Sequence, residues 1–253
     1  MNIAIITGAS SGLGREFALS CAKMYQDIDE IWLVARRKER LESLAGEIGT
    51  GRCRAIAMDL CADDAVRELE QLINEAAADV RLLINNAGFG KLGNIAEMSP
   101  ESQTGMVDLN VKALTGLTTM CLKHMKRGAE IVNVCSIASF APNPRLTVYS
   151  STKAYVLSFT KGLRYELKKS GINCLCVCPG PMRTEFLEVA DITEGASKTF
   201  DTLPYCNAAK VAAGTLKASK KGRCVYTPTA FYKFYRVLAK LLPHNLIMKM
   251  SKA

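Results

Sequence analysis

Short apolar runs alternate with amphipathic stretches along most of this chain. Between the runs, apolar residues recur at helical spacing, for example from Ala65 to Ile73, and Ser99 followed by Pro100 is typical of a helix start. Strands that alternate with helices form βαβ units, so the pattern predicts an α/β fold with a doubly wound parallel sheet of about seven strands and helices on both faces. The strands are expected at 2–7, 30–35, 53–58, 81–85, 130–136, 172–178 and 223–226.

The length and composition indicate one domain. At 253 residues and 49% hydrophobic composition the chain can bury a large core. It contains no linker, internal repeat or low-complexity segment, so we expect a single domain over 1–253. No apolar stretch approaches the ~20 residues that a membrane-spanning helix needs. Because the first predicted strand begins at Met1, we expect no cleaved signal peptide and a cytoplasmic protein.

A glycine-rich turn follows the first predicted strand. Gly8, Gly12 and Gly14 separate that strand from a stretch of helical spacing that starts at Arg15. Glycines let the backbone approach a diphosphate, and a helix N-terminus offers free N–H groups and a partial positive charge. An ordinary tight turn is the alternative, but a strand before the glycines and a helix after them favour a nucleotide site.

Other predicted strands end in residues suited to binding. Thr7, Asn85, Ser136 and Pro179 each stand at the end of a different strand. Binding sites in open parallel sheets lie at the carboxyl ends of the strands. We therefore expect these four positions to converge on one site.

Ser136, Tyr149 and Lys153 form a candidate proton-transfer group. Four residues separate Tyr149 from Lys153, so on a helix they share a face with Cβ atoms roughly 5–6 Å apart. A tyrosine pKa near ~10 suits neutral pH poorly unless positive charge stabilises the phenolate. We expect Lys153 and a charged cofactor to lower the pKa of Tyr149, while Ser136 holds a substrate oxygen. Tyrosine and lysine at this spacing also occur on ordinary solvated helices, and the glycine turn favours the catalytic interpretation.

Together these motifs resemble those of the short-chain dehydrogenase/reductase family over nearly the whole chain. Further matches are Asn-Asn-Ala-Gly at 85–88, Asp-Leu at 59–60 and Pro-Gly-x-x-x-Thr at 179–184. The glycine spacing, Gly-x-x-x-Gly-x-Gly, departs from the more general Gly-x-Gly-x-x-Gly. The resemblance implies a Rossmann-type fold and a catalytic set of Asn110, Ser136, Tyr149 and Lys153, in which Asn110 holds a water for proton supply.

The resemblance also implies a bound nicotinamide dinucleotide. In this assignment Asp59 contacts the adenine and Thr184 the nicotinamide carboxamide. The implied contact residues are Gly8, Ser10, Ser11, Gly12, Leu13, Gly14, Asp59, Leu60, Asn86, Ala87, Gly88, Tyr149, Lys153, Pro179, Gly180 and Thr184.

The end of the second strand favours NADP(H) over NAD(H). NAD-selective sites usually carry an acid there, about 20 residues beyond the glycines, whereas Arg36, Arg37 and Lys38 occupy this point. An arginine fork suits a ribose 2′-phosphate, so we assign the preference to Arg36, supported by Arg37. Ser11 stands where family members often carry a second selecting cation. The alternative is that 36–38 only begin a solvated helix.

The segment of about 186–206 is predicted to be a substrate lid. It contains Gly195, Ser197 and Pro204, which are typical of a mobile loop. Its apolar side chains favour an apolar substrate such as a steroid or an acyl ketone, although they could also simply close the domain. These side chains are Phe186, Leu187, Phe200 and Leu203.

The tail of about 229–242 is predicted to be a basic amphipathic helix. It could pack on its own or a neighbouring subunit, cover the substrate pocket, or rest on a membrane surface, and the last of these is the least favoured. Its apolar face consists of Phe231, Phe234, Leu238 and Leu241, and its basic residues are Lys233, Arg236 and Lys240.

The predicted function is NADP(H)-dependent interconversion of a ketone and a secondary alcohol, with Tyr149 transferring the proton. The alternative is a redox-sensing module that holds NADP(H) without turnover, and the intact catalytic set argues against it. The resemblance also implies a homodimer or homotetramer that pairs through the helices following Ser99 and Val148.

Charge and cysteine usage add little chemistry. The net charge of +9 would suit nucleic acid, but no motif for it is present, so no such partner is expected. Ten cysteines in a chain of this length are expected to stay reduced. No metal site is expected, because there is no Cys-x-x-Cys and the histidines stand far apart, at His124 and His244. Cys174, Cys176 and Cys178 alternate and are expected to be buried on one strand face.

Overall fold

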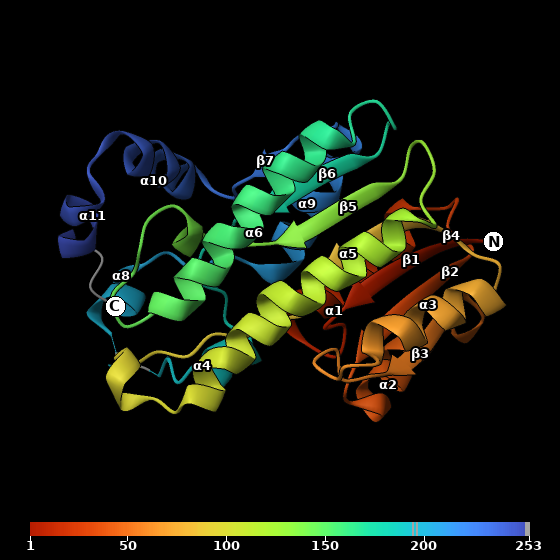
Figure 1. Ribbon diagram of the computed structural model, residues 1–253, viewed down its shortest axis with the longest axis horizontal. Helices are drawn as coiled ribbons and strands as arrows, with labels where there is room; N and C mark the ends of the chain where they lie inside the picture. Colours follow the sequence, from red (N-terminus) through yellow and green to blue (C-terminus); the bar gives the residue numbers. More distant parts are fainter. Residues whose placement is uncertain (194, 196, 251–253) are drawn as a thin grey trace.

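The structure, a computed structural model, describes residues 1–193, 195 and 197–250. A seven-stranded parallel sheet forms its centre, with the strand order β3-β2-β1-β4-β5-β6-β7 (Figure 1). This confirms the predicted α/β class. The strands are β1 (Asn2–Thr7), β2 (Glu30–Ala35), β3 (Cys53–Ala57), β4 (Asp79–Asn85), β5 (Glu130–Val134), β6 (Asn173–Val177) and β7 (Val225–Tyr226).

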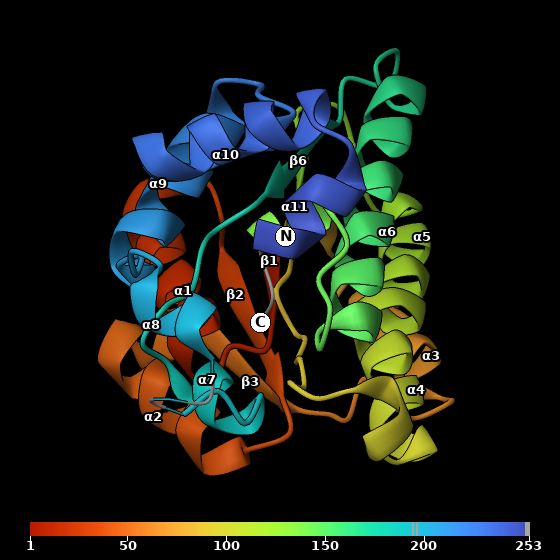
Figure 2. The same cartoon turned by 90° about the vertical axis from the view of Figure 1, so that its left-hand side faces the viewer.

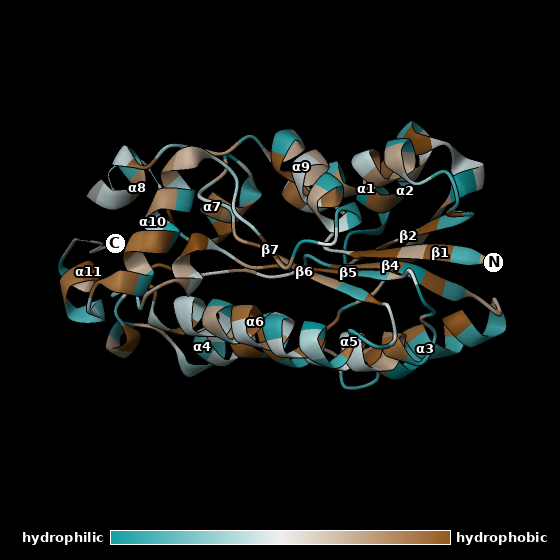
Figure 3. Cartoon of the chain, turned by 90° about the horizontal axis from the view of Figure 1, so that it is seen from above, coloured by the Kyte–Doolittle hydropathy of each residue, from teal (hydrophilic) through white to brown (hydrophobic). Residues whose placement is uncertain are grey.

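Helices cover both faces of the sheet (Figure 3). One layer contains α1 (Gly12–Met24), α2 (Lys38–Ile48) and α9 (Ala208–Lys220). The other contains α3 (Ala65–Glu75), α4 (Pro100–Val107), α5 (Leu114–Leu122) and α6 (Thr147–Glu166).

The two faces of β1 explain why the strands appear in the sequence as continuous apolar runs. Ala4 and Ile6 pack in the core beneath α1, α2 and α9, whereas Ile3 and Ile5 pack in the core beneath α3, α5 and α6. All four side chains are fully buried. A parallel strand covered on both faces carries apolar residues at every position, and alternation is lost.

Several strands end earlier than the sequence indicates. β5 stops at Val134 and β6 at Val177, so Ser136 and Cys178 follow the strands instead of lying in them. β7, at the edge of the sheet, contains only two residues, both paired with β6. β4 begins two residues earlier than expected, at Asp79.

The remaining helices lie at the carboxyl ends of the strands (Figure 2). They are α7 (Glu185–Val189), α8 (Lys198–Thr202), α10 (Ala230–Leu241) and α11 (His244–Met250). β1 lies between β2 and β4, so the strand order reverses there, which opens a crevice at the carboxyl ends. In the part of the chain that the structure describes, every helix is too short or too polar to cross a bilayer.

Candidate active site

The carboxyl ends of the strands surround a cavity of about 940 Å³, at the upper end of the usual range for ligand pockets. The cavity wall includes every residue expected to touch the cofactor or the substrate oxygen, with one exception, Gly14. Asn110, assigned to the proton supply, also lies behind the wall. Residues as far apart in the sequence as Gly8 and Thr184 therefore meet at one site.

The glycine turn forms a cradle for an anion. Gly8 and Gly12 have φ values of +66° and +54°, in the region that favours glycine. A Cβ on Gly14 would overlap the carbonyl oxygen of Gly8, so the first turn of α1 packs directly on the loop. Ser11, at the N-cap of α1, makes no side-chain capping bond. The first N–H groups of the helix are thus available to a diphosphate, and the residues present fit a dinucleotide.

Asn86 fixes the cradle to the centre of the sheet. Its Nδ2 donates to the carbonyl oxygen of Thr7 at 2.9 Å and to that of Gly8 at 3.3 Å. The Thr7 hydroxyl in turn accepts from the backbone N–H groups of Asn86 and Ala87 at 2.9 and 3.0 Å. These bonds join the ends of β1 and β4, so groups of the protein itself hold the loop in place.

Ser136, Tyr149 and Lys153 come together at the cavity wall as expected. Tyr149 and Lys153 lie one turn apart on α6 and are only 8% and 5% exposed. The Lys153 ammonium donates to the Val134 carbonyl oxygen at 2.9 Å and lies 5.8 Å from the centre of the Tyr149 ring. The ring also contacts Phe186, with 5.7 Å between the ring centres.

The pKa of Tyr149 differs from the expectation. Burial raises it above its ordinary value, and interaction with the Ser136 hydroxyl opposes that rise only in part. Burial also lowers the pKa of Lys153. Lys153 is bonded to backbone instead of the phenol, so the groups of the protein alone do not give Tyr149 a lowered pKa. The expected lowering therefore depends on the charge of the cofactor.

Asn110 supports the site from behind. It is buried in a π-helical segment, Asp108–Ala113, between α4 and α5. Its side chain accepts from the Phe89 N–H at 3.0 Å, donates to the Phe89 carbonyl oxygen at 2.9 Å and donates to Thr152 Oγ1 at 3.1 Å. The side chain thus fixes the loop after β4 to α6. π-Helical segments such as Asp108–Ala113 are frequent at functional sites. The expected contact between Asn110 and a water stays a prediction.

The basic residues after β2 are held differently from one another. Arg36 is exposed at the cavity edge, whereas Arg37 donates to Ser10 and Ser11 at 3.0 and 2.9 Å and pairs with Glu185 at 2.9 Å. Arg40 also pairs with Glu185, and the two guanidinium groups, Arg40 first, lower the pKa of Glu185 to about 2. Glu185 and Arg40 could not be identified from the sequence, because no local pattern connects positions 145 or more residues apart.

The predicted lid and tail both border the cavity. Phe186, Leu187, Phe200 and Leu203 all line it, although residues 194 and 196 of the segment lie outside the described part. From the tail, Tyr235 and Leu238 of α10 and Ile247 of α11 line it as well. This placement fits two of the interpretations of the tail, packing on its own subunit and covering the substrate pocket, and the role of the tail stays a prediction.

Tyr232 fixes α10 in this position. Its side chain is fully buried, and its hydroxyl donates to the Pro204 carbonyl oxygen at 2.6 Å. Its ring lies against Gly180, where a Cβ would overlap it. The residues that face inward are therefore Tyr232, Tyr235 and Ala239, and most of the face predicted from Phe231, Phe234, Leu238 and Leu241 is exposed. The sequence could not show which side of α10 faces inward, because the helix carries apolar residues on both sides.

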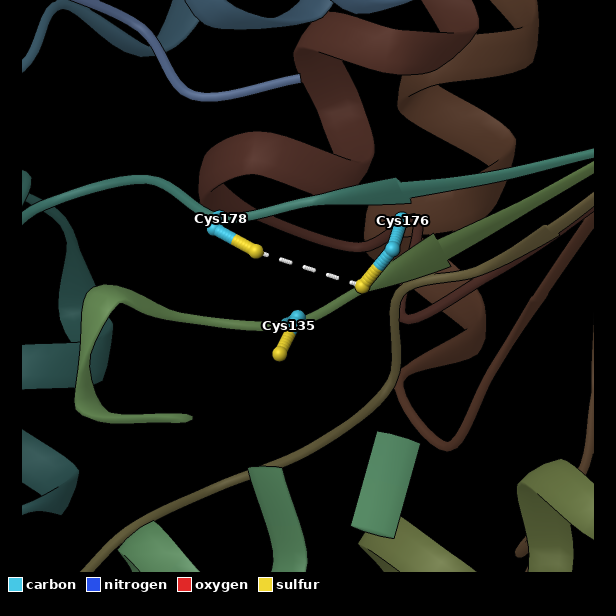
Figure 4. A group of neighbouring side chains, drawn as sticks. All are labelled: Cys135, Cys176 and Cys178. Carbon is cyan, nitrogen blue, oxygen red and sulfur yellow. Dashed lines mark hydrogen bonds between the residues drawn. The ribbon is translucent and has the colours of Figure 1, made fainter. Parts of the chain in front are cut away.

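Cys135, the residue before Ser136, lies together with Cys176 and Cys178 (Figure 4). The sulfur atoms of Cys135, Cys176 and Cys178 lie within 4.8 Å of one another, and all three residues are buried. Cys135 donates to the Lys153 carbonyl oxygen at 3.1 Å, and burial raises the pKa values of the Cys176 and Cys178 thiols. A metal ion here would require deprotonated thiols in a dry core. The expectation of no metal site stays a prediction.

Comparison with known proteins places this geometry in a family. Residues 2–194 match the family model described as short chain dehydrogenase. The chain is 35% identical over 191 residues to sulfoacetaldehyde reductase 2 of Chromohalobacter salexigens, covering 73% of this chain and 74% of that protein.

Two solved structures are similar along almost the whole chain. A short-chain dehydrogenase from Sphingobium yanoikuyae in complex with NADPH has a TM-score of 0.79 at 28% identity, with 96% of each chain covered. A 3-ketoacyl-(acyl-carrier-protein) reductase from Brucella melitensis complexed with NADH has a TM-score of 0.76 at 26% identity, covering 90% of this chain and 96% of that one. With the family model matching most of its length, the chain belongs to the short-chain dehydrogenase family of oxidoreductases.

Proposed function

We propose that the protein is an NADP(H)-dependent oxidoreductase that interconverts a ketone and a secondary alcohol on an apolar substrate. The observation that carries the proposal is the meeting of Ser136, Tyr149 and Lys153 at the wall of the cavity that the glycine cradle also borders. A proton donor and an anion site thus face the same space. The reaction class needs both, since a hydride and a proton are transferred together.

The residues of the site divide the work as follows. When bound, the nicotinamide supplies or accepts the hydride. Tyr149 protonates the carbonyl oxygen during reduction and accepts the proton back during oxidation. Ser136 positions the same oxygen by hydrogen bonding, and Lys153 contributes positive charge beside the phenol, in a dry environment where such charge acts strongly. Asn110 bonds to Phe89 in the loop after β4 and to Thr152 of α6. These bonds fix the position of Phe89 relative to the helix that carries Tyr149.

The lining of the cavity supports an apolar substrate such as a hydroxysteroid or an acyl ketone. Beyond Tyr149 the wall is formed mainly by aromatic and aliphatic side chains, which come from the segment 186–206 and from the tail. Apolar walls with a few polar groups are typical of sites that bind such molecules. The wall residues in question are Phe186, Leu187, Ile192, Phe200, Leu203, Tyr235, Leu238 and Ile247.

Turnover separates this proposal from the redox-sensing alternative. We expect apolar ketones to be reduced with NADPH, followed by the loss of nicotinamide absorbance, and the corresponding secondary alcohols to be oxidised with NADP⁺. Binding of NADPH without turnover of any member of a panel of steroid, acyl and aryl ketones would favour the sensing module instead.

Replacing Arg36 by Asp tests the cofactor preference. We expect kcat/KM for NADPH relative to NADH to fall roughly 10- to 100-fold, because a charge-assisted contact worth about 1.5–3 kcal/mol is replaced by repulsion of the 2′-phosphate. Lys38→Asp is the matched control, since Lys38 is exposed at the first position of α2 and lies outside the cavity wall. An equal shift in both variants would show a general charge effect and would place the 2′-phosphate elsewhere.

Glu185→Gln is expected to strengthen NADPH binding by about two- to fivefold with little effect on NADH. Glu185 forms ion pairs with Arg37 and Arg40. Each exposed ion pair of this kind stabilises the paired arrangement by about 0.2–1 kcal/mol. The neutral form of Glu185 would leave both guanidinium groups to the 2′-phosphate. Cofactor affinities measured by fluorescence titration check this, with Glu188→Gln on the same helix as the control. Weaker NADPH binding would mean that Glu185 positions Arg37 instead of competing for it.

The proposal extends to a homodimer or homotetramer formed through α4 and α6. Val107 and Tyr155 are exposed apolar residues on these two helices, and α4 packs against α6. Light scattering on the purified protein would determine the number of subunits.

A further inference from the structure

The outer side of α10 is an exposed apolar surface. Phe231, Phe234, Val237 and Leu241 are 52%, 67%, 55% and 76% exposed, and we refer to these four residues as the outer face. Successive residues of a helix turn by about 100°, which places the four on one continuous side. Leu246 of α11 is also exposed nearby in the sequence. Isolated exposed apolar residues are ordinary, but a contiguous group of them marks an interaction site.

Basic residues accompany the outer face. Lys233, Arg236 and Lys240 lie along the neighbouring side of α10, between the outer face and the buried side of Tyr232 and Ala239. None of these three basic residues forms an ion pair with any residue that the structure describes. The helix thus has three sides, one inserted into the protein, one basic and one apolar.

The excess of basic residues comes from the C-terminal part of the sequence. The chain has 33 Lys and Arg residues against 24 Asp and Glu residues. All 24 acids lie within residues 1–201 together with 23 of the basic residues, and residues 202–253 hold the other ten basic residues and no acid. The net charge of +9 is therefore a property of the C-terminal fifth of the chain, in which α10 carries three of the ten basic residues.

We propose that α10 docks the protein on an anionic lipid surface, with the outer face in the boundary of the bilayer and Lys233, Arg236 and Lys240 at the headgroups. Apolar insertion next to unpaired cations is the physical requirement for binding of this kind. A second copy of the chain fits the surface less well. An antiparallel symmetric contact through α10 would place the basic side of one helix against that of the other, with no acid on either to compensate.

The position of the cavity also supports an orientation with the outer face of α10 toward the bilayer. Phe231 and Leu238 belong both to the lining of the cavity and to the outward half of α10, and Phe231 is half exposed. The cavity therefore reaches the surface beside the outer face. An apolar molecule dissolved in the bilayer would meet the cavity entrance without crossing water. This last point rests on the proposed function, whereas the docking itself does not.

Sedimentation of the full chain with lipid vesicles tests the proposal. We expect binding to phosphatidylcholine vesicles that contain phosphatidylglycerol and little binding to pure phosphatidylcholine vesicles. Replacing both Phe234 and Leu241 by Ser should reduce the partition coefficient at least tenfold, since two large apolar side chains no longer insert. Replacing both Lys233 and Lys240 by Glu should reduce it by a similar factor, because the charge of the basic side reverses.

Matched controls lie on α6 and just beyond its end. Tyr165→Ser removes an equally exposed aromatic residue, and the double change of Lys161 and Lys168 to Glu makes the same charge change as the Lys233 and Lys240 pair. Both controls should bind vesicles like the unmodified chain. Thermal unfolding and NADPH binding should be unchanged in every variant, because none of these residues lines the cavity.

Four results would overturn docking through α10. They are the absence of binding to anionic vesicles at low salt, equal losses in the control variants, vesicle binding that survives loss of Phe234 and Leu241, and a dimer in solution that the same loss converts to monomer. The last would identify a second copy as the occupant of the outer face. All of these measurements report lipid binding or assembly, so they are independent of whether the proposed reaction occurs.

Discussion

Tyr149→Phe is expected to lower kcat for ketone reduction at least about a hundredfold and up to about ten-thousandfold, the range attributed to a positioned general acid. The dissociation constant for NADPH should stay within about twofold, because the phenylalanine ring keeps the packing against Phe186 and Lys153 keeps its bond to the Val134 carbonyl oxygen. The fold should also hold, since the change removes only a buried hydroxyl whose bonding partner is Ser136. Single-turnover kinetics and fluorescence titration of NADPH measure the two quantities separately.

Tyr155→Phe provides the matched control for this prediction. Tyr155 lies on the same helix, six residues further along, and its hydroxyl contacts Thr115 at 2.9 Å on the exposed side. We expect its removal to leave kcat within about twofold, as is usual for a surface change. Comparable kcat values in the Tyr149 and Tyr155 variants would mean that another group supplies the proton, and the proposed mechanism would then be wrong.

Gly14→Ala is expected to weaken NADPH binding about a hundredfold and to lower the free energy of unfolding by about 1–3 kcal/mol. The added Cβ would overlap the Gly8 carbonyl oxygen and approach Asn86 Nδ2 to 2.5 Å. Neither atom can move freely, because Asn86 is bonded to both Thr7 and Gly8. Either α1 or the glycine loop must shift, and the N–H groups that hold the diphosphate lose their alignment. Cofactor titration and urea unfolding measure the two effects.

Gly46→Ala makes the same chemical change where nothing obstructs it. Gly46 lies inside α2, is exposed, and a Cβ there has no neighbour within 4 Å. Alanine should stabilise that helix by up to about 1 kcal/mol and leave NADPH binding unchanged. If Gly14→Ala behaved like Gly46→Ala, the close packing of α1 on the glycine loop would not matter for the cofactor.

The parts of the fold that the sequence predicts are those with a local signal. β1, β2, β4, β5 and β6 appear as apolar runs because most of their residues are buried on both sides, and the alternation with helices then indicates the parallel sheet. The sequence predicts the ends of the strands less accurately, and β5, which ends at Val134 before Ser136, is an example. The backbone hydrogen bonds that end a strand depend on its neighbours, and those are not visible in the sequence around it.

The site shows the same division. The motif residues from Gly8 to Thr184 could be named because their spacing within each segment is informative. The pairing of Glu185 with Arg37 and Arg40, and the closeness of Cys135 to Cys178, could not be foreseen, because they arise when distant segments meet in space. The orientation of α10 depends similarly on where Tyr232 inserts, and an apolar stripe on a helix does not reveal whether it turns toward protein or away from it.

The contact between Tyr232 and Gly180 has a consequence for sequence variation among similar proteins. A ring at 232 occupies the volume in which any side chain at 180 would begin, so the two positions cannot change independently. Chains that keep an aromatic residue in the tail at this point must keep glycine after Pro179. Chains that have lost the tail, or carry a small residue there, are free to place a larger residue at this point of the cavity wall.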